Sequence, residues 1–188
     1  APLDARVLGY TAGEDYLLDE RLVRYDVQAS LAHARMLHDQ KLLSAQDLAT
    51  ITAGLTDLAQ AHANGEWHIE LADEDGQTAL ESHLTQKIGE AGARIHLGRS
   101  RNDQVLTALR LYLRDATHEL ATGARRVAAA LDELGKREHD TALPGYTHMQ
   151  QAMPSSVALG AGVGAAEIRD DAQNLEGVLR RLGRNPLG

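Results

Sequence analysis

The sequence contains no cysteine and no phenylalanine, and only one tryptophan and four prolines among its 188 residues. The lack of cysteine excludes disulfide bonds and thiol chemistry. Without phenylalanine, a core must be built mainly from Leu, Ala, Val and Ile. Because Ala and Leu are strong helix formers, this composition favours an all-α protein. A chain of this length can bury such a core as one large domain or two small ones.

Long apolar runs and an excess of basic charge are also missing. No apolar stretch approaches the length that a membrane-spanning helix requires, and residues 1–4 lack the features of a signal peptide. The formal net charge is −8, which argues against nucleic acid or an anionic membrane as the main partner. We therefore expect a cytoplasmic protein whose partner is a small molecule.

Apolar residues recur every three or four positions over most of the chain, which is typical of helices. Ser44 and Asp47 have the spacing of a helix cap, and Gly65 and Gly89 follow the ends of two periodic segments. Residues 1–13 carry little periodic signal. The periodicity predicts helices over residues 14–40, 45–63, 77–88 and 102–136, and a last helix that begins near residue 155.

The stretch of residues 92–100, which carries Gly and Arg, is the expected boundary between two domains, residues 1–98 and 99–188. The helix that follows, of about 35 residues, is longer than most helices of globular domains. We expect it to begin a bundle of long helices whose apolar faces need further helices from the same or other chains. Residues 139–154 are expected to form a loop.

The run Gly98–Gln104 is the first candidate site, because two arginines, a serine and an asparagine stand where the long helix begins. The free amides of a helix start attract anions, and arginine binds carboxylates through two hydrogen bonds. The run therefore predicts a carboxylate-binding site. An ordinary polar helix cap with solvated arginines is the alternative, and the residues alone do not decide between them.

Two further candidates are His148 and Ser30. His148 is suited to proton transfer near neutral pH, and it lies in the segment between Gly145 and Pro154. A plain surface histidine is the alternative, since the chain has nine histidines. Ser30 lies within a predicted helix, where the usual explanation is a hydroxyl that bonds its own backbone.

Other patterns predict no cofactor and no metal ion. The glycine-rich run Gly160–Gly164 follows no predicted strand, and the last helix pattern continues through it, so close helix packing is favoured over a nucleotide loop. The pairs His33 and His38, or His139 and His148, lack the further ligands that a zinc site needs.

The candidate runs resemble the argininosuccinate lyase family of the fumarase/aspartase superfamily. His96–Val105 is similar to the family's first signature, and Pro144–Gln150 is similar to its second. The segments that resemble the family's early helix and the loop after its second central helix are Asp26–Ser30, Ala32–Leu37 and Asn185–Gly188. The resemblance implies an all-α fold, with a small N-terminal helical domain followed by the first long helices of a central bundle.

The resemblance also implies a reaction and residue roles. The family splits argininosuccinate into arginine and fumarate, the last step of arginine biosynthesis, and it uses no cofactor. His148 matches a catalytic acid–base residue. The family is a homotetramer in which several subunits contribute to each active site. The positions that match substrate-binding residues are Ser30, Arg101, Asn102 and Thr147.

Three departures separate this chain from the family pattern. Gln77 stands where the family has a histidine, and Leu97 stands where it often has a threonine. The family's flexible loop with a second catalytic serine is not among these residues, so the isolated chain is expected to be inactive. The alternatives are another superfamily lyase, such as adenylosuccinate lyase, and a non-catalytic crystallin-like homologue. The Ser-Arg-Asn-Asp-Gln run favours the arginine branch, and His148 argues against the non-catalytic reading.

Overall fold

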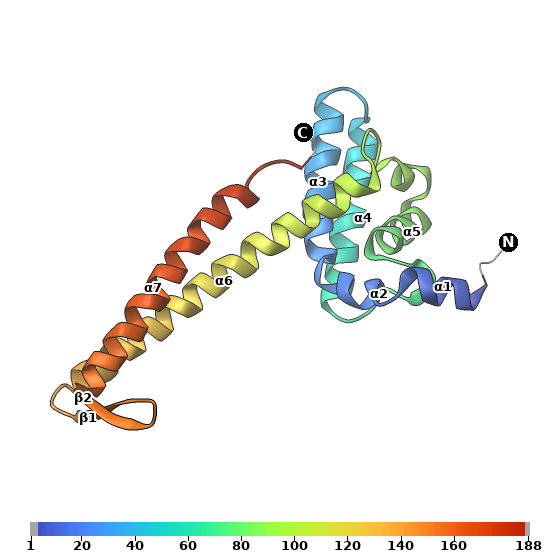
Figure 1. Ribbon diagram of the computed structural model, residues 1–188. Helices are drawn as coiled ribbons and strands as arrows, with labels where there is room; N and C mark the ends of the chain where they lie inside the picture. Colours follow the sequence, from blue (N-terminus) through green and yellow to red (C-terminus); the bar gives the residue numbers. More distant parts are fainter. Residues whose placement is uncertain (1–3, 187–188) are drawn as a thin grey trace. The chain divides into compact units, whose positions relative to one another are not determined.

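The computed structural model describes residues 4–186, which form helices and one two-stranded antiparallel sheet (Figure 1). By their contacts, these residues divide into two compact units. Unit 1 runs to Tyr112 and includes residues 185–186, and unit 2 runs from Leu113 to Arg184. The elements, with 3₁₀ helices written η, are α1 Ala5–Ala12, α2 Asp15–Leu18, η1 Asp19–Arg21, α3 Val23–Asp39, α4 Ala45–Ala63, η2 Leu71–Asp73, α5 Gly76–Ile88, η3 Gly89–Arg94, α6 Arg101–Arg137, β1 Ala142–Thr147, β2 Gln150–Ser156 and α7 Val157–Leu182.

Four of the five predicted helices begin and end close to where the sequence predicts, whereas the predicted helix over residues 14–40 is divided into α2, η1 and α3. The hydroxyl of Ser44 accepts a hydrogen bond from the backbone N–H of Asp47 at 3.0 Å, which caps α4 as expected. Gly65 and Gly89 follow α4 and α5 with φ values of 72° and 70°, a region that glycine enters without steric cost. The mainly helical fold that the composition predicts is therefore confirmed.

The core of unit 1 lies between α3, α4 and α5. Ile51 and Leu55 of α4 and Leu84 of α5 are completely buried. A methyl group on Gly54 would lie 2.7 Å from Cδ1 of Leu84, so a glycine is what allows α4 and α5 to approach this closely. The buried cluster that these helices share consists of Val27, Ala34, Leu37, Leu43, Ile51, Leu55, Leu58, Leu80, Leu84 and Ile95.

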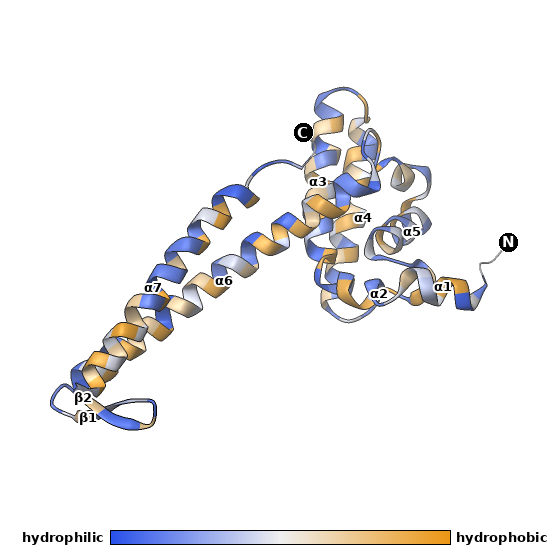
Figure 2. Cartoon of the chain, in the orientation of Figure 1, coloured by the Kyte–Doolittle hydropathy of each residue, from blue (hydrophilic) through white to orange (hydrophobic). Residues whose placement is uncertain are grey.

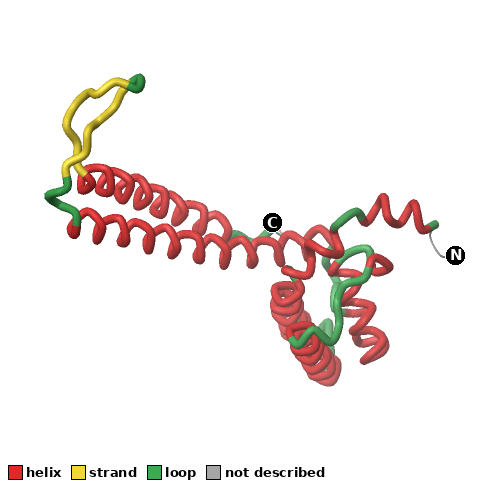
Figure 3. The backbone as a smooth tube through the Cα atoms, turned by 90° about the horizontal axis from the view of Figure 1, so that it is seen from below, coloured by secondary structure: helices red, strands yellow, loops and turns green. Residues whose placement is uncertain are grey.

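In unit 2, the C-terminal part of α6 and α7 run antiparallel, side by side (Figures 1 and 3). The two helices lie close together at Gly164, where an added methyl group would be 3.4 Å from Cδ1 of Leu131. The run Gly160–Gly164 lies within α7, so it forms part of a helix, as predicted. Leu120 and Val127 remain 62% and 51% exposed, and apolar residues recur along both helices in Figure 2. The expectation that further helices cover these faces stays a prediction.

Two further local features differ from the sequence prediction. Residues 142–156 form the hairpin β1–β2 rather than a loop (Figure 3). Both strands are almost entirely exposed, so no alternation of apolar and polar residues marks them in the sequence. Residues 5–12 form α1, and the carboxylate of Asp4 caps this helix by accepting from the backbone N–H of Arg6.

The division into domains 1–98 and 99–188 stays a prediction. Among the described residues, the first part of α6 packs with unit 1, where the ring of Tyr112 contacts the ring of Tyr25 at 5.9 Å between centroids. Within residues 4–186, no helix is both long enough and apolar enough to cross a membrane. The predicted end segment Asn185–Gly188 lies partly outside the described residues, since residues 187 and 188 are not described.

Candidate functional site

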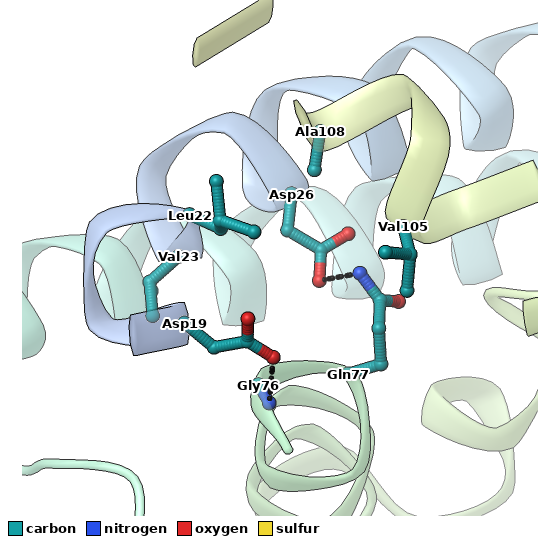
Figure 4. Close-up of a pocket in the computed structure, with 8 residues that line it drawn as sticks. All are labelled: Asp19, Leu22, Val23, Asp26, Gly76, Gln77, Val105 and Ala108. Atoms are coloured by element: carbon teal, nitrogen blue, oxygen red, sulfur yellow. Dashed lines mark hydrogen bonds between the residues drawn. The ribbon is translucent and has the colours of Figure 1, made fainter. Parts of the chain in front are cut away.

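A cluster of buried polar side chains lies between α3 and α5 in unit 1. Asp26 of α3 is 3% exposed, and Ser30, one helical turn later, is 1% exposed. The side-chain amide of Gln77, from α5, donates a hydrogen bond to Oδ2 of Asp26 (Figure 4). The guanidinium of Arg99, in the segment before α6, acts on Asp26 electrostatically. We refer to Asp26, Ser30, Gln77 and the half-buried Arg99 as the buried polar cluster.

Three atoms of the buried polar cluster have no hydrogen-bond partner among the described residues: Oδ1 of Asp26, Oγ of Ser30 and Nε of Arg99. Buried polar atoms are nearly always paired, so each unpaired one requires an explanation. The ordinary explanation for Ser30, a hydroxyl bonded to its own helix backbone, is wrong here. The hydroxyl is enclosed within unit 1, where it acts on the carboxyl of Asp26.

Burial controls the charge of the cluster. Burial raises the pKa of Asp26 to about 7, against the opposing effects of the Gln77 amide, the Arg99 guanidinium and the Ser30 hydroxyl. The carboxylate of Asp19 adds to the rise. Burial likewise lowers the pKa of Arg99, whose Nη2 donates to the carbonyl of Ile95 at 3.1 Å. Asp26 therefore changes charge near neutral pH.

A small cavity adjoins Asp26 (Figure 4). Its free space is about 10 Å³, which is the lower limit for one water molecule and far too little for a substrate. Asp19 lies on its far side, where Oδ2 accepts from the backbone N–H of Gly76 at 3.0 Å. The lining residues are Asp19, Leu22, Val23, Asp26, Gly76, Gln77, Val105 and Ala108.

The start of α6 is a reciprocal cap. The backbone N–H of Ser100 donates to Asp103 at 2.8 Å, and the N–H of Asp103 donates to the Ser100 hydroxyl at 3.4 Å. Arg101 contacts Oδ1 of Asp75 at 3.1 Å and also donates to the hydroxyl of Thr78. A helix cap is therefore present, and the side chain of Arg101 is 49% exposed as well as paired with Asp75. Asn102 is exposed.

The second candidate run forms the tip of the hairpin in unit 2. Thr147 pairs with Gln150, so His148 and Met149 make a two-residue turn. Their φ values are 49° and 62°, as in a type I′ turn, which usually requires Asn and Gly. Left-handed backbone at other residues costs roughly 1–3 kcal/mol and is concentrated at functional sites. The turn holds the exposed His148 on a hydrogen-bonded hairpin rather than on a loop.

The structure thus distributes the five predicted site residues over the two units. Ser30, Arg101 and Asn102 belong to unit 1, and Thr147 and His148 belong to unit 2. The roles assigned to them stay predictions.

Sequence reasoning missed the part played by Asp26 and Asp75. The four-residue spacing between Asp26 and Ser30 was the available signal, because residues so spaced share one face of a helix. Asp75 could have been recognised as the cap of α5, since its carboxylate accepts from the N–H of Thr78 at 2.8 Å.

Leu97, which stands where the family often has a threonine, makes a contact with α3 through its backbone. Nε2 of His33 lies 2.8 Å from the carbonyl oxygen of Leu97. Because a carbonyl only accepts, Nε2 carries the hydrogen, and Nδ1 remains an acceptor. Burial lowers the pKa of His33, which favours this neutral form. The contact ties α3 to the first signature without the side chain at position 97.

Comparison with known sequences identifies one family over nearly the whole chain. The family model described as "Lyase" matches residues 9–188. The argininosuccinate lyase of Sorangium cellulosum is 43% identical over 185 residues, which are 98% of this chain and 43% of that protein. The argininosuccinate lyase of Thermotoga neapolitana is 37% identical over 186 residues, 99% of this chain and 47% of that protein. The chain spans less than half the length of these relatives.

Solved structures share the fold. A variant of EDDS lyase with bound fumarate superposes with a TM-score of 0.78 at 24% identity, covering 98% of this chain and 37% of that chain. A fumarate lyase:delta crystallin from Brucella melitensis gives a TM-score of 0.73 at 20% identity, covering 88% of this chain and 42% of that chain. At these identities the structures support the fold alone. The match over residues 9–188 shows that the chain belongs to the lyase family.

Proposed function

We propose that this chain is the N-terminal part of an argininosuccinate lyase, which eliminates arginine from argininosuccinate and releases fumarate. The observation that carries the proposal is the similarity, at 37–43% identity over at least 98% of the chain, to proteins named argininosuccinate lyase. The segments of the family signatures, Gly98–Gln104 and Pro144–Gln150, add chemical support.

The reaction requires two proton transfers and a site for carboxylates. A base removes the proton from the carbon next to a carboxylate, and the electron pair of the C–N bond leaves with the guanidinium nitrogen. A general acid or base on each side of the substrate raises the reaction rate by roughly 10²–10⁴-fold. Negative charge that develops on the substrate carboxylate is stabilised by donors already in place, often the largest catalytic term.

His148 is the acid–base residue that we propose for one side of this reaction. Its imidazole is exposed at the tip of a hairpin, and imidazole is the side chain most often used for general acid–base catalysis. We assign carboxylate binding to Ser30, Arg101, Asn102 and Thr147.

We further propose a cytoplasmic homotetramer whose subunits share active sites, acting in arginine biosynthesis without a cofactor. The exposed apolar residues of unit 2, such as Leu120 and Leu159, support a helical partner for this surface. The resemblance assigns the second proton-transfer residue to a serine outside these 188 residues. We therefore propose that the 188-residue chain alone does not release fumarate.

The test is fumarate release, followed by ultraviolet absorbance, from the complete polypeptide that carries this sequence. Argininosuccinate and adenylosuccinate are compared as substrates. Release from argininosuccinate alone supports the proposal, and preferential release from adenylosuccinate assigns the protein to the other branch. If neither substrate releases fumarate while the protein is folded, the non-catalytic alternative replaces the proposal. The replacement of the family histidine by Gln77 is the observation that favours that alternative.

A further inference from the structure

A second cavity lies in unit 1, apart from the residues to which we assign roles in the reaction. Its free space is about 390 Å³, which falls within the range of roughly 300–1,000 Å³ that is usual for sites of small ligands. The residues that line it come from η1, α3, α4 and α6. The cavity beside Asp26, at about 10 Å³, is too small for such a ligand. We refer to the larger cavity as the arginine pocket, because Arg21 and Arg24 line it.

The apolar part of the arginine pocket comes from Val23, Ala59, Ala63 and Tyr112. The ring of Tyr112 is held edge-on against the ring of Tyr25, with 5.9 Å between the centroids and 77° between the planes. The small side chains at positions 59 and 63 leave room beside this ring. A fixed aromatic ring next to small aliphatic side chains favours a flat aromatic ligand, because aromatic rings attract one another in offset-stacked or edge-to-face arrangements.

The negative charge that lines the pocket is already bound within unit 1. Oε1 of Glu20 accepts from the backbone N–H of Ile69 at 2.6 Å, and Oε2 lies 2.5 Å from Nε2 of His62. Because a carboxylate only accepts, Nε2 of His62 carries the hydrogen. The imidazole also contacts the ring of Trp67, with 5.1 Å between the centroids. Both oxygens of Glu20 therefore have partners of their own, which weakens their repulsion of an anion.

The positive charge of the pocket comes from Arg21 and Arg24, three positions apart where α3 begins. The guanidinium of Arg24 lies over the ring of Tyr25, 4.4 Å from its centroid, and donates to the Tyr25 hydroxyl. A guanidinium has five N–H donors, so most of those of Arg24 remain for a ligand. The side chain of Arg21 is exposed and has no ion pair with any described residue. Arginine binds carboxylates through two parallel hydrogen bonds, so the pocket favours a carboxylate.

We propose that the arginine pocket binds a small aromatic carboxylate, whose carboxylate group is held by Arg21 and Arg24 and whose ring lies against Tyr112. The pocket shares no residue with Gly98–Gln104 or Pro144–Gln150. The inference therefore goes beyond the proposed function and does not depend on it. Argininosuccinate and fumarate contain no aromatic ring, so neither is the ligand that this pocket favours.

Calorimetric titration of 2-naphthoate into the complete polypeptide at pH 7 tests the site. We expect saturable binding of one molecule to each chain. The loss of one hydrogen bond to a charged group corresponds to about a tenfold change in affinity, so Arg21→Gln and Arg24→Gln should each weaken binding by about that factor. Arg35→Gln is the matched control, because Arg35 is an exposed arginine of α3 that does not line the pocket. This variant should bind 2-naphthoate as the parent does.

Three further comparisons test the carboxylate, the ring and the cavity separately. The amide 2-naphthamide has the same rings without the charge, and cyclohexanecarboxylate has the charge without an aromatic ring, so both should bind more weakly than 2-naphthoate. Ala63→Met places a longer side chain in the pocket and should also weaken binding. Ala63 is exposed at the end of α4, so this variant should keep the fold, which circular dichroism checks.

Failure of 2-naphthoate to bind at millimolar concentration would overturn the proposal. Equal affinities for 2-naphthoate and 2-naphthamide would do so too, and so would an unchanged affinity in both arginine variants or in Ala63→Met. Saturating fumarate should leave the affinity for 2-naphthoate unchanged. Displacement of 2-naphthoate by fumarate would instead assign its binding to the proposed active site and contradict a separate pocket. Whether the polypeptide cleaves argininosuccinate affects none of these results.

Discussion

The side-chain amide of Gln77 donates a hydrogen bond to the buried carboxyl group of Asp26, and this bond joins α5 to α3 across 51 positions of the sequence. The family that the chain resembles usually has a histidine at the position of Gln77. An amide such as that of Gln77 does not titrate. The group beside it that changes charge near neutral pH is the carboxyl of Asp26, because burial raises the pKa of Asp26 to about 7.

Asp26 makes the stability of unit 1 depend on pH. Its folded-state pKa, about 7, lies above the ordinary value of 3.8. Its favourable contribution is therefore complete below pH 3.8 and is lost as pH rises toward 7, by up to about 4 kcal/mol. Relative to the parent, Asp26→Asn should gain free energy of unfolding from pH 4 to pH 7 and level off above. Urea titrations at unit pH intervals measure this difference, and a constant difference would contradict it.

Removing Gln77 should destabilise the fold more than removing an exposed glutamine of the same helix. Gln77→Ala leaves Oδ2 of Asp26 buried without its donor, at a cost of about 1–3 kcal/mol. The exposed Gln86, also in α5, is the matched control, and Gln86→Ala should change stability by less than about 0.5 kcal/mol. Equal urea midpoints for the two variants would show that the Asp26–Gln77 bond contributes nothing.

Two glycines of unit 2 should respond to alanine in opposite directions. A methyl group on Gly145 would lie 2.5 Å from the carbonyl oxygen of Met153, so Gly145→Ala should distort the hairpin. Gly162, within α7, has no atom within 4 Å of such a methyl group, and Gly162→Ala should stabilise the helix by about 0.5–1 kcal/mol. Thermal unfolding and amide exchange of residues 142–156 in the 188-residue chain measure both effects. Unchanged exchange in Gly145→Ala would refute the first.

The sequence predicts the helices better than the contacts between them. Ser44, Gly65 and Gly89 are local signals, so α4 and α5 could be placed from the sequence alone. The hairpin could not, because its strands are exposed and its turn residues, His148 and Met149, are not those that usually form such turns.

The candidate site was predicted only in part for a related reason. Ser30, Asn102 and His148 could be proposed from short runs, but the bond between Asp26 and Gln77 joins distant segments and leaves no periodic trace. The ion pair between Arg101 and Asp75 is equally non-local, which is why the sequence left solvated arginines open.

Asn102 and His148 should affect different kinetic constants. Asn102 is exposed at the first turn of α6, where the free amides of a helix attract carboxylates. Asn102→Ala should therefore chiefly raise KM, with turnover falling only as far as the lost contact also stabilises the transition state. Steady-state kinetics of the complete enzyme separate the two constants. A pure loss of kcat in Asn102→Ala would contradict the binding role.

The kinetics of His148→Asn in the complete enzyme test the account most directly. Asparagine tolerates the positive φ of 49° at this position, so the hairpin turn should be retained while proton exchange near neutral pH is lost. The native oligomer is confirmed first, because damage to the helical bundle would mimic a catalytic defect. The account predicts that kcat falls by roughly 100-fold or more, with a much smaller change in KM. A variant that keeps parental turnover would contradict the acid–base role of His148.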